Sequence, residues 1–213
     1  MPINSTRNFC FRIIHKDNLA HVLRHGLVTK HHPSADPGFV SIGNPEIIDV
    51  RGTTPVKLEG YGNIGDYVPF YLTPRSIMLY NIITGYYAPK VPQRGKAEIV
   101  VLRFKMDALA NLPQWFFTNG QANDEETRHY NDLLRLDQID WPSIQASNFQ
   151  NSDGDYDRSR RYQAEFLVRN IVPVEYIESI IVYNEEIKAL VEGLLLAADI
   201  EIPVFIHKPY LFD

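Results

Sequence analysis

The order of the apolar segments constrains the fold of this chain more than any other feature. Short runs rich in Val, Ile, Leu and aromatic residues are mixed with stretches of helical period, and no regular strand–helix–strand repeat connects them. A regular repeat favours a doubly wound parallel sheet, whereas this irregular order favours a sheet with helices segregated from it. The sequence therefore predicts an α+β fold. Its 213 residues, 45% of them hydrophobic, suffice for a single domain over residues 1–213.

The individual elements follow from residue pattern and end signals. Apolar and β-branched runs predict strands at residues 9–15, 67–74, 97–105, 162–168, 178–183 and 202–207. Helical spacing predicts helices at 17–26, 75–85 and 185–199, and the acidic segment 123–137 is expected as a surface helix. Asp17 is the expected N-cap of the first helix. The last helix carries one apolar stripe, made of Ile187, Leu190, Val191, Leu194, Leu195 and Ala198.

Two long segments are crowded with turn-forming residues. Gly, Pro, Asn and Asp recur throughout 30–66 and in the polar stretch 141–160, so both are expected to be mostly loop. Loops of this length inside a compact domain are usually functional or disordered. Scattered Ile, Val and Phe residues in the first segment favour an ordered binding element there.

Charge and composition limit the classes of function. A formal net charge of -5 argues against a protein that coats nucleic acid non-specifically, but it permits a local basic groove. The cluster Arg158, Arg160, Arg161 and Arg169 is a candidate for such a groove, with a solvated loop as the alternative. No apolar run approaches the roughly 18 to 20 residues that span a bilayer, and the first ten residues lack the apolar part of a secretory signal. With one cysteine, Cys10, expected to be a small buried thiol, the chain is expected in the cytoplasm.

Standard motifs for nucleotide binding and hydrolysis are missing from the sequence. His21 and His25 are four residues apart on the first expected helix, and His31 and His32 follow shortly after. Imidazole nitrogens suit zinc, but the chain offers no matching cysteine pair and no defined ligand spacing. Hydrogen-bonded or surface histidines are the favoured interpretation, and no metal site is predicted.

One carboxylate has an unusual context, in "RRYQAEFLVRN" at residues 160–170. Strand alternation places Phe166 and Val168 on one face and Gln163, Glu165 and Leu167 on the other, which allows Glu165 to project into a cleft. The alternative is a solvated charge on a half-exposed strand, and pattern alone favours that alternative.

Four segments together resemble one known family: "IIHKDNL", "GDYVPFYLTPRSIMLY", "LDQIDWP" and "RYQAEFLV". With their spacing they are similar to the DarT family of DNA ADP-ribosyltransferases, the toxins of bacterial DarTG toxin–antitoxin systems, and closer to the thymidine-modifying branch. The resemblance implies an ADP-ribosyltransferase fold, in which two packed β-sheets with flanking helices form a cleft for NAD. It also implies sequence-specific transfer of ADP-ribose from NAD to a thymidine base in single-stranded DNA, with release of nicotinamide.

The resemblance also assigns residues to roles. The catalytic glutamate of the family corresponds to Glu165, and the catalytic arginine of an NAD-binding loop at about 30–53 corresponds to Arg51. A carboxylate suits the oxocarbenium character that the ribose develops, and a permanently charged guanidinium suits an anionic acceptor or the NAD diphosphate. The further cofactor contacts that it implies are Arg12, Ile13 and Ile14, through the backbone of the first strand, and His21, Thr29 and Tyr71.

The implied DNA contacts lie in two places. One is Arg75 and Met78, and the other is the end of a substrate-recognition loop at about 118–164, with Arg158, Arg160 and Arg161. Core packing is the alternative for Tyr71 and Met78. The implied partners are NAD, single-stranded DNA and a macrodomain antitoxin, without a metal or a membrane. Alternative functions are ADP-ribosylation of protein or RNA, NAD glycohydrolysis, and a catalytically silent nucleic-acid-binding module.

Overall fold

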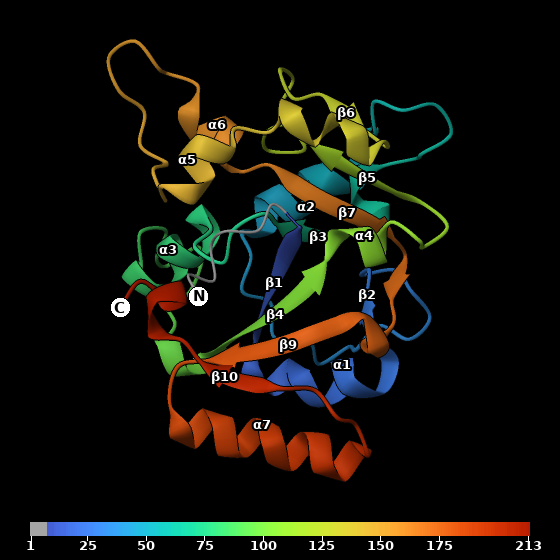
Figure 1. Ribbon diagram of the computed structural model, residues 1–213, viewed down its shortest axis with the longest axis vertical. Coiled ribbons are helices and arrows are strands. Elements are labelled where there is room, and N and C mark those ends of the chain that lie inside the picture. Colours follow the sequence, from blue (N-terminus) through green and yellow to red (C-terminus); the bar gives the residue numbers. More distant parts are fainter. Residues whose placement is uncertain (1–7) are drawn as a thin grey trace.

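The fold is built around a large central sheet (Figure 1). The computed structural model describes residues 8–213 of the chain. The expectation about a secretory signal rests partly on residues 1–7, which lie outside the described residues. The strands of the sheet are, in spatial order, β10 (Val204–Ile206), β9 (Ile177–Val182), β4 (Ile99–Lys105), β1 (Phe9–His15), β3 (Tyr67–Tyr71), β7 (Glu165–Arg169), β5 (Trp115–Thr118) and β6 (His129–Tyr130). A two-stranded sheet pairs β2 (Leu27–Val28) with β8 (Ile171–Val172).

The large sheet is split between β1 and β3. β1 pairs with β4 along its whole length, and β3 pairs with β7 from Tyr67 to Tyr71. Between β1 and β3, in contrast, the described residues contain a single register pair, Phe11 with Tyr71. The sheet therefore consists of two four-stranded halves joined at one point, and the β1 edge beyond Phe11 has no strand partner on the β3 side among residues 8–213.

Helices cover both faces of the β1–β4 half. On one face α1 (Leu19–His25) and α7 (Glu185–Ala198) contribute Val22, Leu23, Val191 and Leu195 to the main core cluster. On the other face α3 (Ile77–Thr84) packs Leu79 and Ile82 in a second cluster. Neighbouring residues of β1 serve different clusters because side chains alternate along a strand. The separate helices and the mainly antiparallel sheet confirm the α+β prediction.

Most of the predicted strands and helices are present, with local differences. A 3-10 turn (Lys16–Asn18) precedes α1, so Asn18 is its N-cap and the assignment of Asp17 was wrong. The apolar stripe of α7 is narrower than predicted, because Leu190 is 40% exposed. The shorter helices are α4 (Met106–Leu109), α5 (Trp141–Gln145) and α6 (Arg158–Tyr162), so the loop expected at 141–160 has a short helix at each end.

The segment 30–66 contains a helix that the sequence pattern did not predict. Helix α2 (Pro45–Thr53) has no buried residue, so it lacks the apolar stripe by which helices are found in sequences. Its start nevertheless has a clear signal: the side chain of Asn44 accepts a hydrogen bond from the Glu46 amide, and Pro45 occupies the first turn. Arg51 lies in the last turn of this helix.

The expected helix at 123–137 is absent. The segment instead forms irregular turns, β6 and a 3-10 helix (Leu133–Gln138). Asp132 caps that 3-10 helix by accepting from the Leu134 amide. Acidic composition alone was therefore a poor guide, because short polar side chains also favour turns and caps.

Two expectations from composition can be compared with the structure. Cys10 is fully buried in β1, and burial raises the pKa of its thiol, which confirms a packing role over a nucleophilic one. Within residues 8–213 no helix is long and apolar enough to cross a membrane.

Candidate active site

Glu165 begins β7, between β3 and β5, and its side chain is buried. Phe166 and Val168 enter the main core, while Leu167 packs in a cluster on the other face, as the alternation predicted. Only 4% of Glu165 is exposed, so the solvated-charge alternative is wrong. Its backbone N–H donates to Oγ1 of Thr118 at 3.0 Å, which fixes the start of the strand against β5.

Arg51 meets this carboxylate with both of its terminal nitrogens. Nη1 donates to Oε1 of Glu165 at 3.0 Å, and Nη2 lies 2.9 Å from Oε2. Burial alone lowers the pKa of Arg51, but the Glu165 carboxylate more than offsets it and leaves the pKa above its ordinary value. The structure thus joins two residues that are 114 positions apart in the sequence, and it joins them as a charged pair.

A close backbone approach holds α2 where Arg51 can reach Glu165. The 3-10 turn before β3 (Ile64–Asp66) packs directly on the backbone of α2, because Gly65 lacks a side chain. A Cβ added at Gly65 would lie 2.8 Å from the Cα of Gly52 and 3.2 Å from the carbonyl oxygen of Arg51. A Cβ added at Gly52 would meet nothing within 4 Å.

These two glycines give a matched test of the approach. Gly65→Ala is expected to displace α2 and lower the rate of a reaction at this carboxylate by about tenfold or more, because a shift of about 1 Å in a reacting group can cost a hundredfold. Gly52→Ala is expected to leave the rate within about twofold. Steady-state kinetics of both variants, with circular dichroism to check folding, measure the difference. Equal rates would contradict the role of the Gly65 contact.

Arg12 and Tyr71 lie at the junction of the two half-sheets. Nη1 of Arg12 donates to the carbonyl oxygen of Pro69 at 3.1 Å, and burial lowers the pKa of this guanidinium. Tyr71 is the register partner of Glu165, and burial raises its pKa to about 12, so that it is neutral near pH 7. The site therefore contains two guanidiniums and one carboxylate, and its net positive charge suits an anionic ligand.

The other predicted cofactor residues have different surroundings. The side chains of Ile13 and Ile14 are buried in opposite core clusters, so only their backbone is available to a ligand. His21 hydrogen-bonds the carbonyl oxygen of Ser34 through Nε2 at 2.8 Å, and Asn18 makes two hydrogen bonds to Val40. Thr29 is buried, and its N–H donates to the carbonyl oxygen of Asn170. His21 and Asn18 thus fasten the start of segment 30–53 to α1 and to the 3-10 turn before it.

Of the two residues predicted to contact the DNA base, Met78 touches a side chain of the site. The Tyr71 hydroxyl donates to Sδ of Met78 at 3.0 Å, so these two side chains touch. Met78 also packs against the second core cluster, which confirms the core-packing alternative, while its contact with a DNA base stays a prediction. The guanidinium of Arg75 lies 4.5 Å from the ring centre of Phe212, and its carbonyl oxygen accepts from the Tyr162 hydroxyl.

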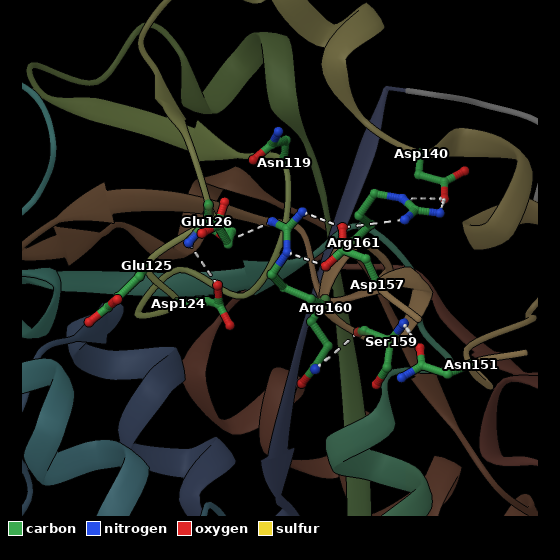
Figure 2. A network of polar contacts seen from close by, with 12 residues as sticks. Asn119, Asp124, Glu125, Glu126, Asp140, Asn151, Asp157, Ser159, Arg160 and Arg161 are labelled. Atoms are coloured by element: carbon green, nitrogen blue, oxygen red, sulfur yellow. Dashed lines mark hydrogen bonds and ion pairs between the residues drawn. The ribbon is translucent and has the colours of Figure 1, made fainter. Parts of the chain in front are cut away.

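The three arginines before β7 are occupied by ion pairs. Figure 2 shows Arg160 and Arg161 facing Asp157, with Asp140 beside Arg161. Arg160 binds Asp157 with two contacts of 2.6 Å, and Arg158 and Arg161 both bind Asp155 at 3.0 Å. Hydrogen bonds from Arg160 hold the pKa of Asp157 below its usual value. Contact of these arginines with DNA phosphates remains a prediction, while their visible contacts organise the segment 118–164.

Sequence patterns missed one direct partner of Glu165. The backbone N–H of Ala122 donates to Oε1 at 3.2 Å. A backbone donor can come from any residue except proline, so no residue type signals it. Among residues 8–213 there is no group of three or more His, Cys, Asp and Glu side chains suited to a metal ion.

A strand glutamate paired with an arginine from the last turn of α2, beside a split in a two-part sheet, is the arrangement expected of an ADP-ribosyltransferase. Within that class the chain belongs to the DarT family, described as ssDNA thymidine ADP-ribosyltransferase, whose sequence profile matches residues 11–212. The chain is 35% identical over 212 residues to a DNA ADP-ribosyl transferase of Escherichia coli O127:H6, covering 99% of this chain and 96% of that protein.

Solved structures are similar over almost the whole chain. Thermus sp. 2.9 DarT in complex with ADP-ribosylated ssDNA matches with a TM-score of 0.85 and 32% identity, covering 96% of each chain. The same protein in complex with NAD+ matches with a TM-score of 0.80 and 32% identity, covering 96% of this chain and 97% of that chain. The predicted family, fold and class of enzyme are confirmed, including NAD as the substrate.

Proposed function

We propose that this protein transfers the ADP-ribose of NAD to a thymine base in single-stranded DNA, in a sequence-specific manner, and that it acts as a toxin. The observation that carries the proposal is the buried Arg51–Glu165 pair beside the split in the sheet, in a chain of the DarT family. Glu165 and Arg51 are the proposed catalytic residues.

The reaction exchanges one glycosidic bond for another. The bond between C1′ of the ribose and the ring nitrogen of nicotinamide breaks, and the positively charged nicotinamide ring leaves neutral with the electron pair. C1′ then has oxocarbenium character until it bonds to N3 of thymine. N3 carries a proton at neutral pH, and this proton must leave as the new bond forms. The site therefore needs negative charge near the ribose and a group that offsets charge on the thymine ring.

Glu165 meets the first need. Its carboxylate is fixed by Arg51 and by the Ala122 N–H, so it does not have to reorganise during the reaction. In a partly desolvated site a fixed carboxylate stabilises an oxocarbenium ion more strongly than it does in water. The same carboxylate is suited to hold the 2′-hydroxyl of the ribose.

Arg51 meets the second need. Its guanidinium stays protonated and is therefore an electrostatic partner for the thymine ring that loses its N3 proton, rather than the base that removes the proton. The NAD diphosphate is a second anion that Arg51 is suited to bind, because a guanidinium donates two parallel hydrogen bonds to phosphate oxygens. Arg12 adds positive charge beside it, which also favours an anionic substrate.

Two segments are assigned around this pair within a single domain, 1–213. Segment 30–53 is the proposed NAD-binding element, because it carries Arg51 and is fastened by His21 and Asn18. Segment 118–164 is the proposed DNA-recognition element, because Thr118 and Ala122 contact Glu165. Further proposed contacts with NAD are the β1 backbone, Thr29 and Tyr71, and the proposed contacts with DNA are Arg75, Met78, Arg158, Arg160 and Arg161.

The decisive experiment incubates the protein with NAD labelled in its adenylate part and with oligonucleotides that contain or lack thymine. Transfer of label to thymine, located by mass spectrometry, is the expected result, with one nicotinamide released for each modified base. NAD cleavage without labelled DNA would instead support a glycohydrolase, and label on protein or RNA would support another acceptor. Oligonucleotide binding with no nicotinamide release would support a silent binding module.

The proposed setting follows from the substrates. NAD and single-stranded DNA are both present in the cytoplasm of bacteria, where such a toxin has to be neutralised. A macrodomain antitoxin that removes ADP-ribose from DNA is the proposed partner, on the strength of family membership. Co-expression with the neighbouring gene product and recovery of cell growth test this pairing.

A further inference from the structure

We propose that Lys57 and His129 are positioning residues, which hold residues 119–129 so that the Ala122 N–H stays on the Glu165 carboxylate. The inference rests on the proposed function, because it assigns these residues to the same reaction. Among the described residues, neither Lys57 nor His129 forms a hydrogen bond with Glu165. Both act on Glu165 through the loop at residues 119–129.

The side chain of Lys57 is a clamp on this loop. Its ammonium donates to three backbone carbonyl oxygens, those of Asp124 at 3.2 Å, Glu125 at 2.6 Å and Thr127 at 2.9 Å. An ammonium has three N–H donors, so the loop occupies all of them. Three carbonyls that converge on one cation restrict the loop to conformations that keep all three within reach of the Lys57 ammonium.

His129 transmits the position of the Lys57 backbone to Ala122. Nδ1 of His129 accepts a hydrogen bond from the Lys57 N–H at 3.0 Å, so the ring proton must be on Nε2. Nε2 then donates to the carbonyl oxygen of Ala122 at 3.0 Å. Burial lowers the pKa of His129, and this effect outweighs the opposing hydrogen bond to the Ala122 carbonyl, which favours the neutral ring that this arrangement requires.

Ala122 completes the connection to the catalytic carboxylate. Its carbonyl oxygen is held by His129, and its N–H donates to Glu165 at 3.2 Å. From the other side, Arg160 fixes the same loop: its carbonyl oxygen accepts from the Gln121 N–H at 3.0 Å, and its Nη1 donates to Oγ1 of Thr127 at 2.9 Å. Figure 2 shows Arg160 between Asp157 and the loop that carries Asp124 and Glu126.

The clamp connects the chain just after the proposed NAD-binding segment with the proposed DNA-recognition segment. Arg51 and Lys57 are six positions apart, and each leads to the Glu165 carboxylate: Arg51 directly, and Lys57 through His129 and Ala122. A role in positioning, in contrast to general stability, predicts that losing the His129–Ala122 bond alone lowers kcat.

Two substitutions of His129 distinguish the His129–Ala122 hydrogen bond from the Lys57–His129 hydrogen bond. In His129→Gln the side-chain amide N–H falls near the position of Nε2 and retains a donor for the Ala122 carbonyl. In His129→Asn the shorter side chain retains an acceptor for the Lys57 N–H but does not reach Ala122. Both variants lose the ring that stacks on Phe116, and they differ from each other by one methylene group.

The expected result is a difference in kcat between the two variants. His129→Asn should have a kcat for transfer to a thymine oligonucleotide about ten- to a hundredfold below that of His129→Gln, with KM for NAD changed less than about threefold. Hydrogen exchange at the Ala122 amide should be faster in His129→Asn. Equal kcat values in the two variants, or a loss confined to KM, would overturn the proposal.

Lys57→Met tests the clamp on the loop without altering the His129 ring. It removes the ammonium and keeps the backbone N–H, and its kcat should fall by about tenfold with an unchanged midpoint of urea unfolding. An unchanged kcat would count against the clamp, whatever the behaviour of the His129 variants. A wild-type protein that transfers nothing to thymine would refute the proposed function itself, whereas active wild type with unaffected variants would refute only this inference.

Discussion

Replacing Glu165 with glutamine is expected to lower kcat for transfer to DNA by about a hundred- to a thousandfold, with the fold intact. Glutamine has nearly the same shape and still offers an oxygen to the Ala122 N–H, but it removes the negative charge that opposes an oxocarbenium ion. The loss of one preorganised electrostatic contact in other enzymes has an effect of this size. Single-turnover transfer from labelled NAD to a thymine oligonucleotide measures it, and titration calorimetry should detect NAD binding to the variant.

The chain contains a matched control for this substitution. Glu178 is also a strand glutamate, on β9, and it forms an ion pair with Arg103, whose Nη2 donates to Oε1 of Glu178 at 3.0 Å. Glu178→Gln should leave kcat within about twofold, because this pair lies in the other half-sheet. If Glu165→Gln retained full transfer, the assignment of the carboxylate as catalytic would be refuted.

Replacing Arg51 with alanine is expected to abolish detectable transfer and also to destabilise the protein by about 3–5 kcal/mol. Both side chains of the pair are largely buried, with 13% and 5% exposed, and the removal of one partner leaves a buried charge without compensation. Arg51→Lys keeps the charge but cannot form the paired contact, so it should regain part of the stability and little of the activity. Urea unfolding and transfer assays on both variants measure the two effects separately.

A double-mutant cycle distinguishes the pair from two independent effects. Arg51→Ala combined with Glu165→Gln removes the uncompensated carboxylate, so the double variant should be more stable than Arg51→Ala alone. Additive losses of stability in the cycle would show that the two side chains do not interact in solution. A stable, fully active Arg51→Ala variant would exclude Arg51 from both roles.

The paired arginines of segment 118–164 illustrate a limit of reasoning from composition. A cluster of basic residues in a polar stretch suggested either phosphate contacts or solvated charge, and carboxylates of the same stretch were not considered as partners. Asp140, Asp155 and Asp157 instead bind all three arginines. Which charges meet depends on how the stretch turns back on itself, and the turns come from contacts such as those of Lys57 and Arg160.

By itself, the sequence determined the class of fold and the main strands and helices. Apolar periodicity sets these features, because it is local and the core has to bury the apolar face of each element. Family resemblance further identified Glu165 and Arg51. Helix α2 was not predicted because it buries no residue and so lacks an apolar stripe. The helix predicted at 123–137 is absent, because that prediction rested on acidic composition without an apolar stripe.

Only the tertiary structure decided how the Glu165 carboxylate is held. Arg51 reaches Glu165 because Gly65 allows two backbones to touch, and Ala122 reaches it because Lys57 and His129 fix a loop through its carbonyl groups. Backbone donors and acceptors are the same at nearly every residue, so their pairing leaves no mark in the sequence. Long-range packing has to bring them together before a glutamate that looked like a surface charge becomes a buried, oriented one.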